Sequence, residues 1–122
     1  MNNTSLINGQ RYLFILSNDS VFVANYLYKL KNHITVDKLS DKYKSNYRDI
    51  FSFEYSNILK VIPISMLIQG NKYTFWYKCI NEPYNRTIDA ELIDINKDTL
   101  YVGNTITSKT LFLYDIIDVL PL

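Results

Sequence analysis

The chain contains one residue pattern twice, and this repetition constrains its fold more than any other feature. Residues 9–14 read Gly-Gln-Arg-Tyr-Leu-Phe, and residues 70–75 read Gly-Asn-Lys-Tyr-Thr-Phe. At the other end of each copy, Ile-Leu-Lys-Val-Ile-Pro-Ile at 58–64 corresponds to Ile-Ile-Asp-Val-Leu-Pro-Leu at 116–122. Two further matches lie between these ends in the same order: 22–25 with 88–91, and 31–36 with 97–102. Such self-similarity indicates one structural unit built twice.

Within each copy, apolar and polar residues alternate with the period of a half-buried strand. In the second copy, Ile88, Ala90 and Leu92 alternate with two acidic residues, and a polar turn of Asn-Lys-Asp follows at 96–98. The pattern predicts five short strands in each copy. They are expected at residues 11–16, 21–29, 33–39, 50–53 and 58–62 in the first copy, and at 72–79, 86–95, 99–102, 110–113 and 116–120 in the second. Tight turns at 54–57 and 113–115, each before a last strand, suit a short 3₁₀ turn.

The predicted fold is therefore all-β, with two tandem five-stranded barrels that arise from an internal duplication and pack on each other. The expected boundaries are an N-terminal tail at 1–8, repeat 1 at 9–64, a short linker at 65–69 and repeat 2 at 70–122. Packing of the copies is expected because the first strand is apolar on both faces. Tyr12 and Phe14 lie on one face, and Leu13 and Ile15 lie on the other. In the second copy, Trp76 is the candidate residue for contact with the first copy.

The second copy, from residue 88 to residue 122, resembles SH3-like barrels and, more loosely, the Sm-like version of that fold. The likeness lies in the alternating segment 88–92, the polar turn at 96–98, Leu-Tyr-Val at 100–102 and the closing segment 113–119. It implies a tandem of SH3-like small β-barrels. Sm-like proteins bind RNA and usually form rings, so the looser likeness implies RNA binding. Ala90 departs from the pattern, because the family usually has Gly there. A likeness of this kind supports the fold rather than an activity.

Composition excludes several functional classes. With 122 residues, 48% of them hydrophobic, the chain can bury a core, and a net charge of +1 gives no strong electrostatic footprint for nucleic acid or an anionic membrane. Cys79 is the only cysteine and His33 the only histidine, so neither a disulfide nor a zinc site is expected. Apolar runs are too short to span a bilayer, and the N-terminus lacks a signal-peptide pattern. We therefore expect an intracellular protein without membrane insertion.

No set of residues forms a catalytic constellation, and no enzyme activity, cofactor or metal is expected. Asp89 and Glu91 lie on one face of a predicted strand, where paired acids could hold a metal ion, but a solvated strand face explains them better. Cys79 and His33 as nucleophile and base would require the two copies to meet at those points. We expect instead that Cys79 is a small buried residue and that His33 is an exposed turn residue.

Aromatic residues are the remaining candidates for a binding site. The chain has 11 tyrosines, and SH3-like barrels that read peptides or methylated lysines do so with aromatic side chains at loop ends. In the polar loop at 40–48, tyrosines and cations interleave, which suits single-stranded nucleic acid. Tyr is also a good strand residue with a polar tip, which is the alternative explanation for its abundance. The candidate partner-binding residues are Tyr43, Lys44, Tyr47, Arg48, Trp76, Tyr84 and Tyr101.

These observations favour a non-catalytic protein-interaction or structural module, whose partner is another protein or a second copy of itself. The skew toward Asn, Ile, Tyr and Lys is typical of A/T-rich genomes, including those of large DNA viruses, so a viral assembly is one expected setting. The alternative is an RNA- or DNA-binding Sm-like barrel protein, which the Sm-like pattern and the loop at 43–48 favour.

Overall fold

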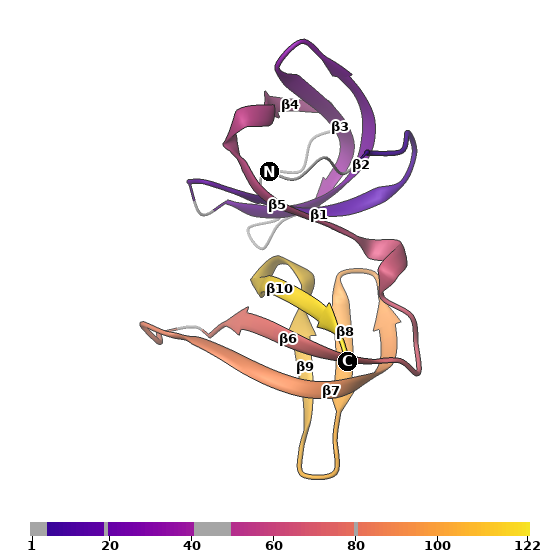
Figure 1. Ribbon diagram of the computed structural model, residues 1–122, viewed down its shortest axis with the longest axis vertical. Coiled ribbons are helices and arrows are strands. Elements are labelled where there is room, and N and C mark those ends of the chain that lie inside the picture. The colour runs from indigo at the N-terminus through magenta and orange to yellow at the C-terminus, as the bar shows by residue number, and fades with distance from the viewer. Residues whose placement is uncertain (1–4, 19, 41–49, 80) are drawn as a thin grey trace. The chain divides into compact units, whose positions relative to one another are not determined.

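The chain folds into two compact units, each with one five-stranded antiparallel sheet (Figure 1). The computed structural model describes residues 5–18, 20–40, 50–79 and 81–122. The division falls between Met1–Ile64, here called unit 1, and Ser65–Leu122, called unit 2. Within the described ranges, the helical segments are three short 3₁₀ turns. The prediction of an all-β chain with two five-stranded repeats is confirmed.

Unit 1 is a meander whose last strand returns to the first. Its elements are β1 (Arg11–Leu16), β2 (Val21–Leu30), β3 (His33–Ser40), β4 (Ile50–Glu54), η1 (Tyr55–Asn57) and β5 (Ile58–Pro63). The strand order is β4-β3-β2-β1-β5, with antiparallel neighbours throughout. Aromatic rings fill the core: Phe14, Phe22 and Phe53 have centroids 5.2, 5.3 and 5.4 Å apart. Such ring pairs add to the free energy gained by burying apolar surface.

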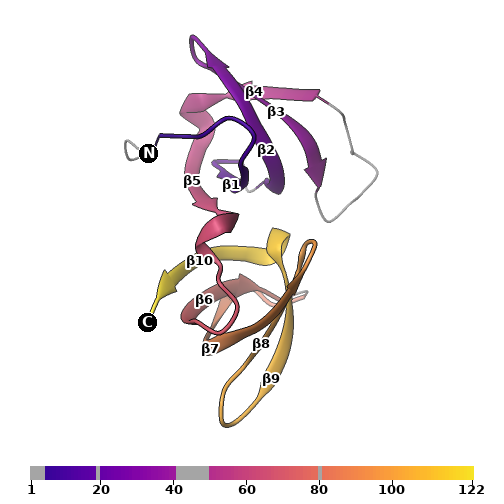
Figure 2. The ribbon, with the colours of Figure 1, turned by 90° about the vertical axis from the view of Figure 1, so that its right-hand side faces the viewer.

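Unit 2 repeats this arrangement. After η2 (Ile64–Met66), its elements are β6 (Lys72–Lys78), β7 (Asn85–Asn96), β8 (Thr99–Gly103), β9 (Ser108–Phe112), η3 (Leu113–Asp115) and β10 (Ile116–Pro121). The order β10-β6-β7-β8-β9 is the same connectivity as in unit 1. Phe75, Leu100 and Ile116 are fully buried in its core. β7 curves strongly (Figure 2) and carries a β-bulge between Leu92 and Asp94, a feature that bends a strand.

The residues that open each copy in the sequence have the same backbone role in both units. Gly9 and Gly70 have φ angles of +84° and +93°, and each donates its N–H to a carbonyl of the second strand of its unit at 2.7 Å. Tyr12 and Tyr73 are buried, and each hydroxyl accepts a hydrogen bond at 2.8 Å from the backbone N–H five residues earlier. The repeated glycine and tyrosine are therefore structural positions.

The sheets differ from the predicted barrels because they are open. Within the described residues, no ladder joins β4 to β5 or β9 to β10, so these four strands form the sheet edges. In each unit a three-residue 3₁₀ turn connects the fourth strand to the fifth. The turn sends the chain to the opposite edge of the sheet instead of folding it back as a hairpin.

Most strand limits agree with the prediction, and 3₁₀ turns occur where the sequence suggests them. The main error is β9, which was expected at 110–113 and spans Ser108–Phe112. Ser108 and Lys109 are both polar, so the alternation does not include them, whereas Leu113 belongs to η3. Both faces of β1 are buried, as its apolar pattern predicts. Packing of the two copies on each other stays a prediction.

Candidate functional site

The candidate site lies on the outer face of the unit 2 sheet, where side chains point away from the core. Side chains alternate between the two faces of a strand. On β8, Leu100 and Val102 are buried, so Tyr101 and Gly103 face outward. On β9, Leu111 is buried and Phe112 faces outward.

Exposed aromatic rings gather on this face. Tyr101 pairs across the ladder with Thr110, so Tyr101 and Phe112 are diagonal neighbours on adjacent strands. Tyr101 is 39% exposed and Phe112 is 43% exposed. The Phe112 ring stacks on that of Tyr114 with centroids 5.6 Å apart and an interplanar angle of 3°. We call Ile93, Tyr101, Phe112 and Tyr114 the outer aromatic face.

Gly103 makes room for the aliphatic member of this face. Ile93 is the extra residue in the β7 bulge and is 48% exposed. A Cβ added to Gly103 would lie 2.9 Å from Ile93 Cδ1, which is closer than such atoms normally approach. The missing side chain at Gly103 therefore lets Ile93 lie against β8.

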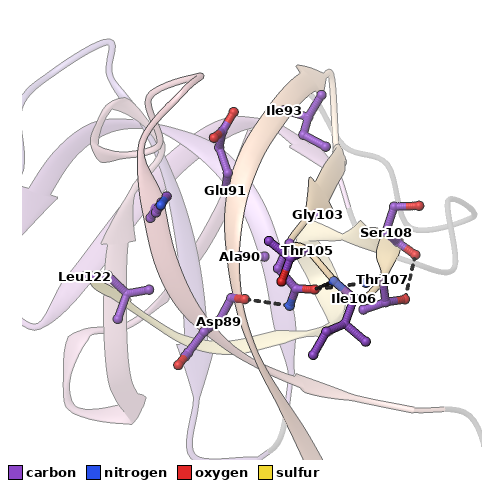
Figure 3. Close-up of a pocket in the computed structure, with 12 residues that line it drawn as sticks. Asp89, Ala90, Glu91, Ile93, Gly103, Thr105, Ile106, Thr107, Ser108 and Leu122 are labelled. Carbon is purple, nitrogen blue, oxygen red and sulfur yellow. Dashed lines mark hydrogen bonds between the residues drawn. The ribbon is translucent and has the colours of Figure 1, made fainter.

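Asn104 ties the β8–β9 hairpin to β7. Its N–H donates to the Thr107 carbonyl at 2.8 Å, and its Oδ1 accepts from the N–H groups of Ile106 and Thr107, both at 2.9 Å. Its Nδ2 donates to the Asp89 carbonyl at 2.9 Å, across to β7 (Figure 3). One side chain thus closes the turn and fixes its position against the neighbouring strand.

A solvent-open pocket of about 690 Å³ lies between this hairpin, β7 and the C-terminal residue. Asp89 and Glu91 project from β7, with the hairpin on one side and Leu122 on the other (Figure 3). Asp89 Oδ1 accepts a hydrogen bond from Thr74 Oγ1 at 2.6 Å. The pocket therefore combines two carboxylates with apolar walls. Its lining consists of Lys72, Asp89, Ala90, Glu91, Ile93, Gly103, Asn104, Thr105, Ile106, Thr107, Ser108 and Leu122.

The pocket joins the outer aromatic face through Ile93, which belongs to both. Among the described residues, no group of three His, Cys, Asp or Glu side chains could hold a metal ion. The pair of Asp89 and Glu91, considered for a metal in the sequence, thus has no third ligand of these types within that part of the chain. The pocket suits contact with polar groups at the margin of an apolar surface.

A bidentate ion pair organises the β6–β7 connection. Arg86 donates to Glu82 through Nε at 2.8 Å and through Nη2 at 2.7 Å. These hydrogen bonds lower the pKa of Glu82 and raise that of Arg86. Cys79, in the same connection, is half-buried rather than buried as expected, because it follows the end of β6. His33 is exposed next to a turn, as predicted.

The sequence-predicted site residues do not form one cluster. Tyr43, Lys44, Tyr47 and Arg48 lie outside the described residues. Trp76 is half-buried on β6 opposite Thr87, and Tyr84 is 60% exposed in the β6–β7 connection. Tyr101 pairs with Asp94, toward the other end of β7. Of the predicted residues that the structure describes, Tyr101 alone belongs to the outer aromatic face.

Sequence reasoning missed Ile93, Phe112, Tyr114 and the hairpin residue Asn104. One available signal was the segment Leu-Phe-Leu at 111–113, because two inward leucines require the phenylalanine between them to point outward. The role of Ile93 had no such signal, since it depends on a bulge and on a glycine in the next strand.

Comparisons with protein-family models, with curated proteins and with solved structures find no match to this chain. The described residues include no helix with the length and apolar character needed to cross a membrane.

Proposed function

We propose that this chain is a non-catalytic protein-interaction module that contacts a protein partner through the outer aromatic face of unit 2. The observation that carries the proposal is the exposure of Ile93, Tyr101 and Phe112 together on one face of a sheet whose core residues are buried. Contiguous exposed apolar surface marks interaction sites, and aromatic residues are enriched at the centres of interfaces.

The polar surroundings fit the same role. Protein interfaces have an apolar centre and a polar rim, and here the pocket next to Ile93 supplies carboxylates, a lysine and hydroxyl groups. The stacked pair of Phe112 and Tyr114 presents a flat surface with few rotatable bonds. These side chains therefore lose little conformational entropy when a partner binds.

We propose further that each unit has the strand connectivity of SH3-like domains, with its sheet left open. The support is the connectivity, in which the fifth strand pairs with the first and a 3₁₀ turn precedes it in both units. An experimentally determined structure of the full chain tests this proposal. Superposition of unit 1 on unit 2, and of both on SH3-like domains, is expected, whereas a different connectivity in either unit would contradict it.

Quantitative affinity capture from extracts of the cells that make the protein tests the interaction surface. The Tyr101→Ala variant should recover its partner at least about tenfold less well than the wild type, because it removes a ring from the interface centre. Tyr84→Ala is the matched control, since Tyr84 is exposed in the β6–β7 connection, away from this face. Equal recovery by Tyr101→Ala and wild type would overturn the proposed surface.

Charge distribution favours a second candidate function, nucleic-acid binding by unit 1. Residues 1–64 contain eight Lys and Arg against five Asp and Glu, a net +3, whereas residues 65–122 contain five against seven, a net −2. At the tip of the β2–β3 hairpin, Tyr28 and Leu30 are exposed beside Lys31. Exposed aromatic and cationic groups of this kind suit single-stranded nucleic acid.

Fluorescence anisotropy with a labelled single-stranded oligonucleotide tests this alternative. Binding should weaken steeply as salt rises, because phosphate contacts release counterions. Lys31→Gln should weaken it, whereas Lys97→Gln should not, since Lys97 has the equivalent turn position in unit 2 with a similar φ of 55° against 53°. An absence of binding at low salt would exclude the alternative.

A further inference from the structure

The two edges of the unit 2 sheet differ in what they offer to another strand. The edges are β9 and β10. In an antiparallel ladder, the backbone N–H and C=O groups of alternate residues point to one side, and those of the remaining residues point to the other. A single hydrogen bond from an edge strand to its inner neighbour therefore shows which residues of the edge strand direct their backbone groups to the free edge.

On β9, three residues present their backbone groups to the free edge. The Asn104 N–H bonds to the Thr107 carbonyl, and the Leu113 N–H bonds to the Asp98 carbonyl, both at 2.8 Å. These bonds show that the backbone groups of residues 107, 109, 111 and 113 point toward β8. The backbone groups of Ser108, Thr110 and Phe112 therefore point away from β8. Within the described residues, the N–H groups of these three residues have no hydrogen-bond partner.

On β10, the last two backbone positions at the free edge offer no free donor. The Leu122 N–H bonds to the Lys72 carbonyl at 3.0 Å, so the backbone groups of Val119 and Pro121 point to the free edge, although the Val119 side chain is buried in the core. Pro121 has no N–H, and the Val119 N–H donates to Asp118 Oδ1 at 2.8 Å. Proline and charged side chains are common protections of edge strands. Thus the C-terminal part of β10 is protected against strand addition, whereas β9 is open to it.

We infer that β9 pairs with β9 of a second copy of the chain, antiparallel about a two-fold axis that passes between the two Thr110 residues. In this register Thr110 lies opposite its own copy, and Ser108 lies opposite Phe112. About six backbone hydrogen bonds would form, because the outward-facing residues of both strands become hydrogen-bonded pairs. The two five-stranded sheets then join into one.

Self-complementarity favours a second copy as the occupant. Lys109 is the charged residue of β9, and the register places it opposite Leu111, so no like charges face each other. Its Nζ lies 3.0 Å from the Tyr77 hydroxyl, on the core side of the sheet. A two-fold interface uses the same edge in both copies and leaves out the blocked edge of β10. Pairing also places two outer aromatic faces on one continuous sheet. The inference therefore extends the proposed function, in which this face binds a protein partner.

A proline at the two-fold axis tests the inference in the full chain. Sedimentation equilibrium of the wild type should show a mass rising with concentration from 14.4 kDa toward twice that value. Thr110→Pro removes the central N–H of each copy, and because this N–H faces away from β8, the strand tolerates the change. The dimer dissociation constant should rise about 10- to 100-fold for the two lost hydrogen bonds. Thr110→Val keeps the N–H and should change the constant less than about threefold.

Introduction of a charge at the same position tests the inference even if the proline variant does not fold. Thr110→Lys and Thr110→Glu alter an exposed side chain and should each reduce dimerisation, because like charges then face each other across the axis. A mixture of the two variants should form the heterodimer, which native mass spectrometry detects. Equal association of Thr110→Lys alone and of the mixture would contradict the register.

A wild type that stays monomeric at every concentration overturns the inference, as does equal association of Thr110→Pro and Thr110→Val when both are folded. The proposed function fails separately. If the chain is monomeric but partner capture still depends on Tyr101, the proposed function holds and this inference fails. If the chain dimerises through β9 but Tyr101→Ala captures the partner as well as the wild type does, this inference holds and the proposed function fails.

Discussion

A buried hydroxyl fixes the segment that leads into the first strand of each unit. Tyr73 accepts a hydrogen bond from the Ile68 N–H at 2.8 Å and donates one to the Met66 carbonyl at 2.6 Å. Tyr12 accepts the corresponding bond from the Ile7 N–H. A buried tyrosine needs a partner for its polar tip. The repeated tyrosine is therefore explained by local structure and is not evidence for a ligand site.

Two glycines of unit 2 differ in how strictly they are needed: Gly70 has a backbone conformation that favours glycine, whereas Gly103 only leaves space for Ile93. Gly70→Ala should lower the free energy of unfolding by about 1–2 kcal/mol, because its φ of +93° is unfavourable for any side chain. Gly103→Ala should change it by less than about 1 kcal/mol, because the new Cβ meets only the flexible end of Ile93 and a strand alanine reduces unfolded-state entropy. Urea unfolding measures both. A larger cost at Gly103 than at Gly70 would contradict this assignment.

At the scale of elements, the β6–β7 connection contains a pH-sensitive ion pair. Glu82 should titrate in the folded chain below its ordinary pKa, because Arg86 donates two hydrogen bonds to its carboxylate. A lowered folded pKa means that the pair's stabilisation is present at neutral pH. It is lost as pH falls through the folded pKa. Arg86 is exposed and Glu82 is half-buried at the surface, so water screens the pair and the effect on unfolding is small.

Carboxyl NMR measures the Glu82 pKa directly. Arg86→Gln should return it to its ordinary value, whereas Arg86→Lys should return it only partly, because lysine keeps the charge but not the two-pronged geometry. An unchanged titration in Arg86→Gln would mean that another group holds the carboxylate in its ionised form.

At the scale of the whole molecule, the repeats are equal in topology but not in burial. Val61 and Val119 occupy matching positions, opposite Phe14 and Phe75. Val119 is buried, whereas Val61 is half-buried. Val119→Asp should therefore destabilise the chain by about 3–5 kcal/mol, since an unpaired charge would be buried. Val61→Asp should cost only about 1–2 kcal/mol, because its carboxylate reaches water. Thermal unfolding measures both, and equal costs would contradict this difference.

The sequence predicted most of the fold because its signals are local. Alternation located the strands, and the Gly, Asn and Pro residues located the turns and strand ends. The repeated Gly-polar-basic-Tyr segment identified two equal units, since it forms the same hydrogen bonds in each. The candidate site was predicted only through Tyr101. Ile93 and Phe112 reach the same face because of pairings between residues distant in the chain, which single-sequence patterns do not contain.

The sequence by itself determined the strand-forming segments, the order of the elements and the doubling of the unit, because backbone propensity and hydrophobic period act over a few residues. Only the tertiary structure decided which strands form the edges, which residues share an outer face and which backbone donors stay unpaired. Those properties depend on register between distant strands. A shift of one residue in register would exchange the buried and exposed faces of a strand.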